Sequence, residues 1–160
     1  MNKFKIRSNS LADTDQIAAL ITPFLKLDDI IILEGDLGGG KTHFVKAFAK
    51  ALKTESAVTS PTFAIANFYP IQSGNILHID AYRLSGVPEY RDLGLDEYYY
   101  DSITFIEWGK QLATEFRDYL FLQIHLGKGE TERFLEITYE GKRWKNRFEE
   151  LQAKLTEFKI

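Results

Sequence analysis

Apolar residues along the chain follow two spacings, which divide it into predicted strands and helices. Residues 30–33 are continuously apolar, as a parallel strand buried on both faces is. Apolar residues at helical spacing predict helices at residues 13–25, within 35–52 and, more weakly, at 87–99, where Gly94 interrupts the pattern. Shorter apolar runs predict further strands at residues 4–7, 63–69, 76–79, 103–106, 121–126 and 134–139.

The last part of the chain carries an amphipathic pattern. Apolar side chains recur there at alternating steps of four and three, at Trp144, Phe148, Leu151, Leu155 and Phe158. The stripe predicts a helix that packs on the core, with a surface for a partner helix as the less favoured alternative. Repeats, low-complexity segments and Gly/Ser-rich linkers are lacking, so we expect residues 1–160 to form a single domain.

A glycine-rich motif follows the predicted strand at residues 30–33. Residues 35–42 match the pattern G-x-x-x-x-G-K-[ST], whose backbone N–H groups surround phosphate oxygens before a helix begins. We expect Lys41 to reach the β- and γ-phosphates and the Thr42 hydroxyl to ligate Mg²⁺. The nucleotide-binding residues predicted from the motif are Gly35, Asp36, Leu37, Gly38, Gly39, Gly40, Lys41 and Thr42.

Together these elements predict an α/β protein with the three-layer P-loop NTPase fold. Its central sheet would be mostly parallel, with helices on both faces. The last two predicted strands are joined by a short polar turn, which predicts antiparallel strands at one edge.

Two predicted strands end in an acidic residue: residues 75–80 end at Asp80 and residues 102–107 at Glu107. In open α/β sheets ligands lie outside the carboxyl ends of the strands, so both acids would face the phosphates. Asp80 would then have the Walker B role toward Mg²⁺. Glu107 would ligate Mg²⁺, or orient and deprotonate the attacking water. The alternative for each acid is a helix cap.

Other polar residues give weaker signals. Thr62, in the segment Thr-Ser-Pro-Thr-Phe, is either a sensor of the γ-phosphate or part of an ordinary turn. The three histidines lack the spacing of metal ligands, and His78 is expected to pack at its strand end. The basic cluster at residues 142–147 is expected to be a solvated helix start, with an RNA or protein contact as the alternative.

Composition limits the partners, the types of catalysis and the compartment that we expect for this protein. The chain is 44% hydrophobic and 27% charged, with a net charge of −3, and these values give no overall signature of nucleic-acid binding. The lack of cysteine excludes thiol catalysis and disulfides. There is no signal peptide pattern and no apolar run of membrane-spanning length, so we expect a cytoplasmic protein without a membrane partner.

Three classes of P-loop protein compete. A GTPase switch would carry an Asn-Lys-x-Asp segment, which the sequence lacks. A small-molecule kinase fits the length, but a lid and an acceptor-binding cluster are not evident. An ATPase that drives a partner fits best, because the chain offers two acids and a candidate sensor threonine. A nucleotide-dependent interaction module with negligible turnover is a further alternative.

The order of five segments resembles one family. Residues 35–42 are followed by Thr-Ser-Pro-Thr-Phe at 59–63, His-Ile-Asp-Ala-Tyr-Arg at 78–83, Leu-Gly-Leu-Asp-Glu-Tyr at 93–98 and Glu-Trp at 107–108. In this the chain is similar to the TsaE (YjeE) family of bacterial P-loop ATPases. Gly39 and His43 depart from residues common in the family, without removing a charge or hydroxyl that the mechanism uses.

The resemblance implies a weak, Mg²⁺-dependent ATPase required to form threonylcarbamoyladenosine at position 37 of tRNAs that read codons beginning with A. It would act with TsaD and TsaB, which perform the transfer, and would meet tRNA only through that complex. Lys41, Asp80 and Glu107 would be catalytic, and Thr42, Asp80 and Glu107 would hold the metal. Thr62 and Trp108 would couple the site to the partners, while Thr14 and Arg133 would lie near the nucleotide.

Overall fold

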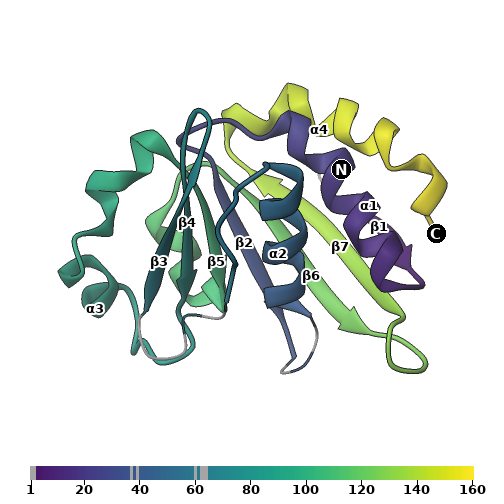
Figure 1. Cartoon of the computed structure of the whole chain (residues 1–160), viewed down its shortest axis with the longest axis horizontal. Helices are drawn as coiled ribbons and strands as arrows, with labels where there is room; N and C mark the ends of the chain where they lie inside the picture. Colours follow the sequence, from purple (N-terminus) through teal and green to yellow (C-terminus); the bar gives the residue numbers. More distant parts are fainter. Residues whose placement is uncertain (1–2, 37, 39, 60, 62–64) are drawn as a thin grey trace.

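A seven-stranded sheet organises the chain (Figure 1). The computed structural model describes residues 3–36, 38, 40–59, 61 and 65–160. The strands lie in the order β1-β7-β6-β2-β5-β4-β3. Their bounds are β1 Lys3–Ser8, β2 Ile30–Gly35, β3 Ala66–Ile71, β4 Gly74–Asp80, β5 Ser102–Glu107, β6 Tyr119–Leu126 and β7 Arg133–Glu140.

The middle of the sheet is parallel and both edges are antiparallel. Strands β6, β2, β5 and β4 run parallel, whereas β3, β7 and β1 each pair antiparallel with their neighbour. This confirms the predicted fold class. One detail differs: β6 was expected at the edge with β7, but it lies beside β2 in the parallel part. The short turn fixes only the pairing of β6 with β7, and packing decides what lies on the other side of β6.

Helices and 3₁₀ segments cover the sheet on both faces. Their bounds are α1 Leu11–Ile21, η1 Thr22–Phe24, α2 Lys41–Ala51, α3 Val87–Asp92, η2 Leu95–Asp101, η3 Gly109–Glu115, α4 Lys142–Lys154 and η4 Thr156–Phe158. Helix α1 begins after Ser10, whose side chain accepts a hydrogen bond from the backbone N–H of Asp13. It ends earlier than predicted, because Pro23 has no N–H to continue the ladder.

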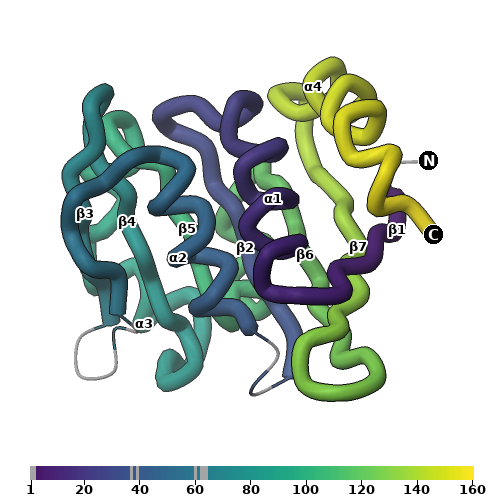
Figure 2. Tube along the Cα trace, turned by 45° about the vertical axis from the view of Figure 1, so that its right-hand side comes forward, coloured from purple at the N-terminus to yellow at the C-terminus, as the bar shows by residue number. Residues whose placement is uncertain are grey.

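Two hydrophobic layers, one on each face, hold the sheet between its helices. On β2, Ile31 and Leu33 belong to the layer under α1, α2 and α4, whereas Ile30 and Ile32 belong to the layer under α3 and η3. The strand is therefore buried on both faces, as its continuous apolar run predicts. Figure 2 shows α1, α2 and α4 on one side of the sheet, and the end of the chain beside β1, where the backbone N–H of Ile160 donates to Lys5.

Helix α4 packs its apolar stripe inward, with Trp144, Phe148 and Leu151 buried. This confirms the core-facing interpretation of the stripe. Its basic side chains also have internal partners: Arg147 forms two hydrogen bonds of 2.8 and 3.0 Å to the buried carboxylate of Asp29, and Arg143 lies 2.9 Å from it. Two of the four cations in the predicted basic cluster thus anchor the helix to the start of β2.

Two further predicted segments shift in the structure. The strand predicted at 63–69 is β3, which begins at Ala66; residues 63 and 64 lie outside the described part of the chain. The weak helical pattern at 87–99 is α3 followed by η2, divided at Gly94, which has a left-handed φ of 66°. In the described residues, none of the helices has the length and apolar character needed to span a membrane.

Candidate nucleotide-binding site

The glycine-rich loop joins the end of β2 to the start of α2. Gly35 has a φ of 149°, and a Cβ atom there would lie 2.4 Å from the carbonyl oxygen of Ile124. Gly38 and Gly40 have φ values of 80° and 97°, a region that side chains disfavour. These glycines let the loop turn closely over the sheet, with the N-terminus of α2 behind it. Leu37 and Gly39 lie outside the described residues.

The Lys41 side chain lies across this loop and is only 5% exposed. Its ammonium donates to the carbonyl oxygens of Gly35 at 2.7 Å and Asp36 at 2.9 Å, and lies 3.8 Å from the centroid of the Trp108 ring. Burial lowers the pKa of Lys41, and the negative charge of Glu107 is the largest effect opposing this shift. The amine is thus fixed at the loop by two carbonyl groups and an aromatic face.

Glu107 ends β5 and contacts the first turn of α2 directly. The Thr42 hydroxyl donates to its carboxylate, with Oγ1 2.8 Å from Oε1 and 3.1 Å from Oε2. The ring of His78 on β4 donates from Nε2 to Oε2. Glu107 is 3% exposed and His78 is fully buried. The sequence pattern predicts His78 near its strand end, but it does not predict this contact with Glu107.

Asp80 ends the neighbouring strand β4, in register with Glu107. It is half-buried and accepts a hydrogen bond of 3.0 Å from the backbone N–H of Tyr82. Among the described residues, the Asp80 carboxylate makes no hydrogen bond to the loop. The structure thus brings both predicted acids to the carboxyl end of the sheet, but only Glu107 contacts Thr42.

The donor set fits Mg²⁺ bound together with phosphate. The described part of the chain contains no group of three or more His, Asp or Glu side chains that could hold a metal ion by themselves. Mg²⁺ typically takes one or two carboxylates, phosphate oxygens and waters. The Thr42 hydroxyl points at Glu107, so its oxygen keeps lone pairs for a cation.

Thr14 and Arg133 both lie beside the glycine-rich loop. They line one small hollow with Gly40, although they come from α1 and β7. Thr14 is buried and its hydroxyl is 2.7 Å from that of Ser8, while Arg133 donates to the carbonyl of Gly38 at 3.4 Å. The two residues that only the resemblance placed near a nucleotide therefore both lie at the loop. Thr62 is among the residues that the structure does not describe.

Comparison with known proteins identifies this architecture. The family model for "Threonylcarbamoyl adenosine biosynthesis protein TsaE" matches residues 8–135, a range that includes every site residue discussed above. The chain belongs to the TsaE family. The similarity noted in the sequence is thereby confirmed.

Individual relatives agree with this assignment. A Bacillus subtilis protein named tRNA threonylcarbamoyladenosine biosynthesis protein TsaE is 36% identical over 152 residues, covering 94% of this chain and 95% of the relative. A protein of the same name from Streptomyces coelicolor is 37% identical over 136 residues, covering 81% and 92%. The crystal structure of Bacillus subtilis YdiB matches with a TM-score of 0.76 at 32% identity, over 97% of this chain and 95% of that one.

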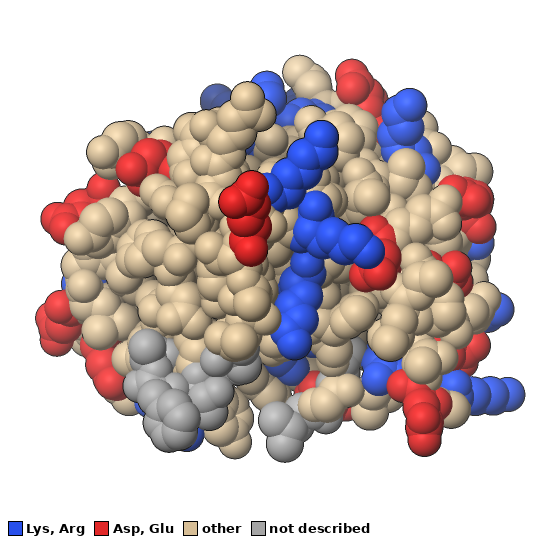
Figure 3. Space-filling model, in the orientation of Figure 1, with Lys and Arg blue, Asp and Glu red and all other residues tan. Residues whose placement is uncertain are grey.

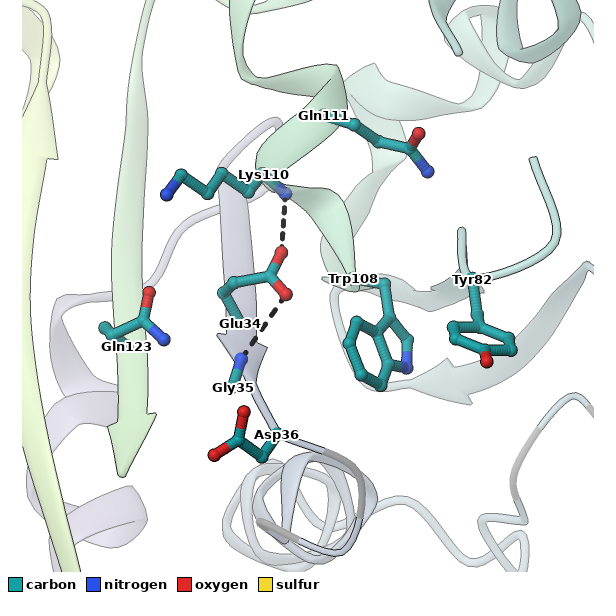
Figure 4. Close-up of a pocket in the computed structure, with 8 residues that line it drawn as sticks. All are labelled: Glu34, Gly35, Asp36, Tyr82, Trp108, Lys110, Gln111 and Gln123. Carbon is teal, nitrogen blue, oxygen red and sulfur yellow. Dashed lines mark hydrogen bonds between the residues drawn. The ribbon is translucent and has the colours of Figure 1, made fainter. Parts of the chain in front are cut away.

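A larger hollow of about 520 Å³ opens beside the loop of this TsaE-family chain (Figure 4). Trp108 and Tyr82 form one wall, with ring centroids 5.0 Å apart, and Glu34 accepts a hydrogen bond from the backbone N–H of Lys110 at 3.0 Å. This hollow was not predictable from the sequence, because its lining comes from several elements. The one sequence signal that points to it is Glu34, a charged residue at the end of an apolar run. The complete lining is Glu34, Gly35, Asp36, Tyr82, Trp108, Lys110, Gln111 and Gln123.

The surface over α2 is locally basic. Lys46 and Lys50 are exposed on the helix and Lys53 follows it, and Figure 3 shows basic side chains gathered there. The net charge of −3 therefore conceals an uneven distribution. In this TsaE-family chain the basic surface lies on the helix whose first turn carries Lys41 and Thr42.

Proposed function

We propose that the chain binds Mg²⁺–ATP at the glycine-rich loop and hydrolyses it weakly, in support of threonylcarbamoyladenosine formation at position 37 of tRNA. The observation that carries the proposal is the contact between Thr42 and Glu107 beside a buried Lys41. It places a cation, a hydroxyl and a carboxylate around the N-terminus of one helix, where phosphate binding is favoured.

Each of these groups has its own task. Lys41 exchanges its carbonyl partners for phosphate oxygens, which are stronger acceptors for an ammonium group. Thr42 and Asp80 would hold Mg²⁺, and Glu107 would hold the Thr42 hydroxyl and orient the attacking water. Mg²⁺, when bound, neutralises charge on the phosphates. Thr14 and Arg133, which line a small hollow with Gly40, would lie near the nucleotide.

In this proposal, ATP hydrolysis changes the state of the partner proteins. TsaD and TsaB transfer the threonylcarbamoyl group, and this chain regulates or resets their complex, meeting tRNA through it in the cytoplasm. Trp108 is suited to couple the two events, because it contacts Lys41 and also lines the open hollow. The relatives named for tRNA threonylcarbamoyladenosine biosynthesis support this role.

A reconstituted tRNA modification assay tests the proposal. Purified TsaD and TsaB are supplied with threonylcarbamoyl-adenylate and tRNA, with and without this chain and ATP. We expect repeated rounds of modification only with the chain and ATP present, and Lys41→Ala to abolish the effect together with nucleotide binding. Modification that is independent of the chain would contradict the role in the pathway.

Two alternatives have distinct outcomes in the same experiments. Transfer of the γ-phosphate to a metabolite at ordinary kinase rates would identify a kinase whose acceptor occupies the hollow beside Trp108. ATP-dependent partner binding with phosphate release at background would identify an interaction module with negligible turnover.

A further inference from the structure

His78 occupies an unusual place for a histidine. It lies on β4, next to the edge strand of the sheet, paired in register with Asn67 on β3 and Phe105 on β5, and is fully buried. It lies two residues before Asp80, so both side chains project from the same face of β4, toward α2. His78 therefore lies on the same face of β4 as Asp80, and this face is turned toward Thr42 and Glu107.

The hydrogen bonding of the ring is one-sided. Nε2 donates to Oε2 of Glu107, whereas the buried Nδ1 lacks a hydrogen-bond partner among the described residues. A buried polar atom without a hydrogen-bond partner destabilises the fold, because it has lost its hydration without replacement. An apolar residue at this position would avoid that cost, so packing alone does not account for the imidazole.

The bond to His78 restricts the Glu107 carboxylate. A glutamate side chain rotates freely about its last torsion unless its oxygens are held. With Oε2 bound to His78, Oε1 faces the Thr42 hydroxyl at 2.8 Å. The Thr42 hydroxyl then donates its hydrogen bond to Glu107, and the lone pairs of its oxygen face away from the carboxylate.

We propose that His78 is a positioning residue that fixes the Glu107 carboxylate against Thr42 and so prepares the hydroxyl oxygen to ligate Mg²⁺. The inference rests on the proposed function, because it concerns the same Mg²⁺–ATP site. It adds a residue outside the glycine-rich loop and the two acids, acting through a carboxylate rather than on the nucleotide.

Calorimetric titration with ATP, once with MgCl₂ and once with EDTA, separates this role from a structural one. We expect His78→Leu to reduce the Mg²⁺-dependent gain in ATP affinity by about 10- to 100-fold, the usual effect of losing a group that orients a metal ligand. Affinity in EDTA stays unchanged, because Lys41 and the loop are intact. His78→Gln, whose amide reaches toward Glu107, restores most of the gain.

A double-mutant cycle identifies the route of the effect. If His78 acts through Glu107, adding His78→Leu to Glu107→Gln leaves the Mg²⁺-dependent affinity unchanged from that of Glu107→Gln alone. Should His78→Leu fail to fold, the pair His78→Gln and His78→Asn carries the test. Both variants are polar, but the shorter asparagine amide falls short of Glu107, so only glutamine should retain the gain.

Opposite results overturn the proposal in identifiable ways. A His78→Leu protein with wild-type Mg²⁺-dependent affinity excludes a positioning role. Equal losses in MgCl₂ and in EDTA, with no recovery in His78→Gln, mean that the histidine is structural. A wild-type chain that gains nothing from Mg²⁺ would instead contradict the proposed function itself.

Discussion

The ends of β4 and β5 carry the same kind of residue in different surroundings. Asp80 and Glu107 are paired in register on adjacent parallel strands. Glu107 is buried and receives hydrogen bonds from Thr42 and His78, whereas Asp80 is half-buried and receives one from the backbone of Tyr82. The two acids look equivalent in the sequence, so the difference between them comes from the sheet.

Distance from β2 explains the difference. Strand β5 lies next to β2, with Glu107 in register with Leu33, and β4 lies one strand further away. Neighbouring strands are about 4.8 Å apart, so Asp80 starts about 10 Å from the strand that carries the loop. A carboxylate on β5 reaches the first turn of α2 directly. One on β4 is placed to act through a cation or water, which makes the two acids separable by mutation.

The largest effect is expected from Glu107→Gln, which keeps the volume of the side chain and removes its charge. Loss of the group that orients water should lower the ATP hydrolysis rate by about 10²- to 10⁴-fold at saturating Mg²⁺. The Mg²⁺-dependent gain in ATP affinity should fall as well, since Thr42 loses its acceptor, while affinity in EDTA is retained. Phosphate release under single-turnover conditions measures the rate. Full recovery of hydrolysis at high Mg²⁺ would make Glu107 only a metal-site residue.

Asp80→Asn should produce a smaller effect of a different kind. Because Asp80 lies further from the loop, we expect the Mg²⁺ concentration needed for half-maximal hydrolysis to rise about 10- to 100-fold, with the rate at saturating Mg²⁺ nearly retained. A Mg²⁺ titration of hydrolysis measures both quantities. A drop in the saturated rate as large as that of Glu107→Gln would show that the two acids share one role, and the contrast drawn from the sheet would be wrong.

The contrast between Asp80 and Glu107 also separates what could be predicted from the sequence from what could not. The strand at 30–33, the loop and α2 were predictable, because a continuous apolar run and a glycine motif are local signals. The placing of both acids at strand ends followed from the same local pattern. Which acid meets Thr42 did not, because strand order is a property of the whole sheet. The role of His78 was missed for the same reason: its partner Glu107 is 29 residues away.

Aromatic residues next to the two acids offer a further, smaller contrast. Trp108 follows Glu107 and lies against the Lys41 ammonium, whereas Tyr82, two residues after Asp80, contacts Trp108. A cation–π contact contributes about 0.5–2 kcal/mol, so Trp108→Leu should weaken ATP binding by about 2- to 30-fold, since the amine is less well fixed. Tyr82→Leu is the matched control and should change affinity less. Tighter binding by Trp108→Leu would mean that the ring holds Lys41 back from phosphate.

The smallest expected effect concerns the pKa of Lys41, which burial lowers from its ordinary value of 10.5. Glu107 opposes the shift most among the acids and Asp80 least, so Glu107→Gln should lower the pKa of Lys41 further than Asp80→Asn does. The pH dependence of Lys41 acylation, followed by mass spectrometry, measures both shifts. Equal shifts in the two variants would contradict the unequal placement of the acids.

The lowered pKa of Lys41 also has a consequence for stability with a definite sign. Between the folded-state pKa and 10.5, the unfolded chain binds more protons at Lys41 than the folded chain does. The free energy of unfolding therefore rises with pH through that window, and Lys41 contributes no pH dependence below it. Glu107→Gln should extend the window to lower pH, and Lys41→Met should abolish the Lys41 contribution. Urea unfolding at several pH values, taken as the difference between wild type and Lys41→Met, measures it; a difference that falls as pH rises would contradict the buried placement of the amine.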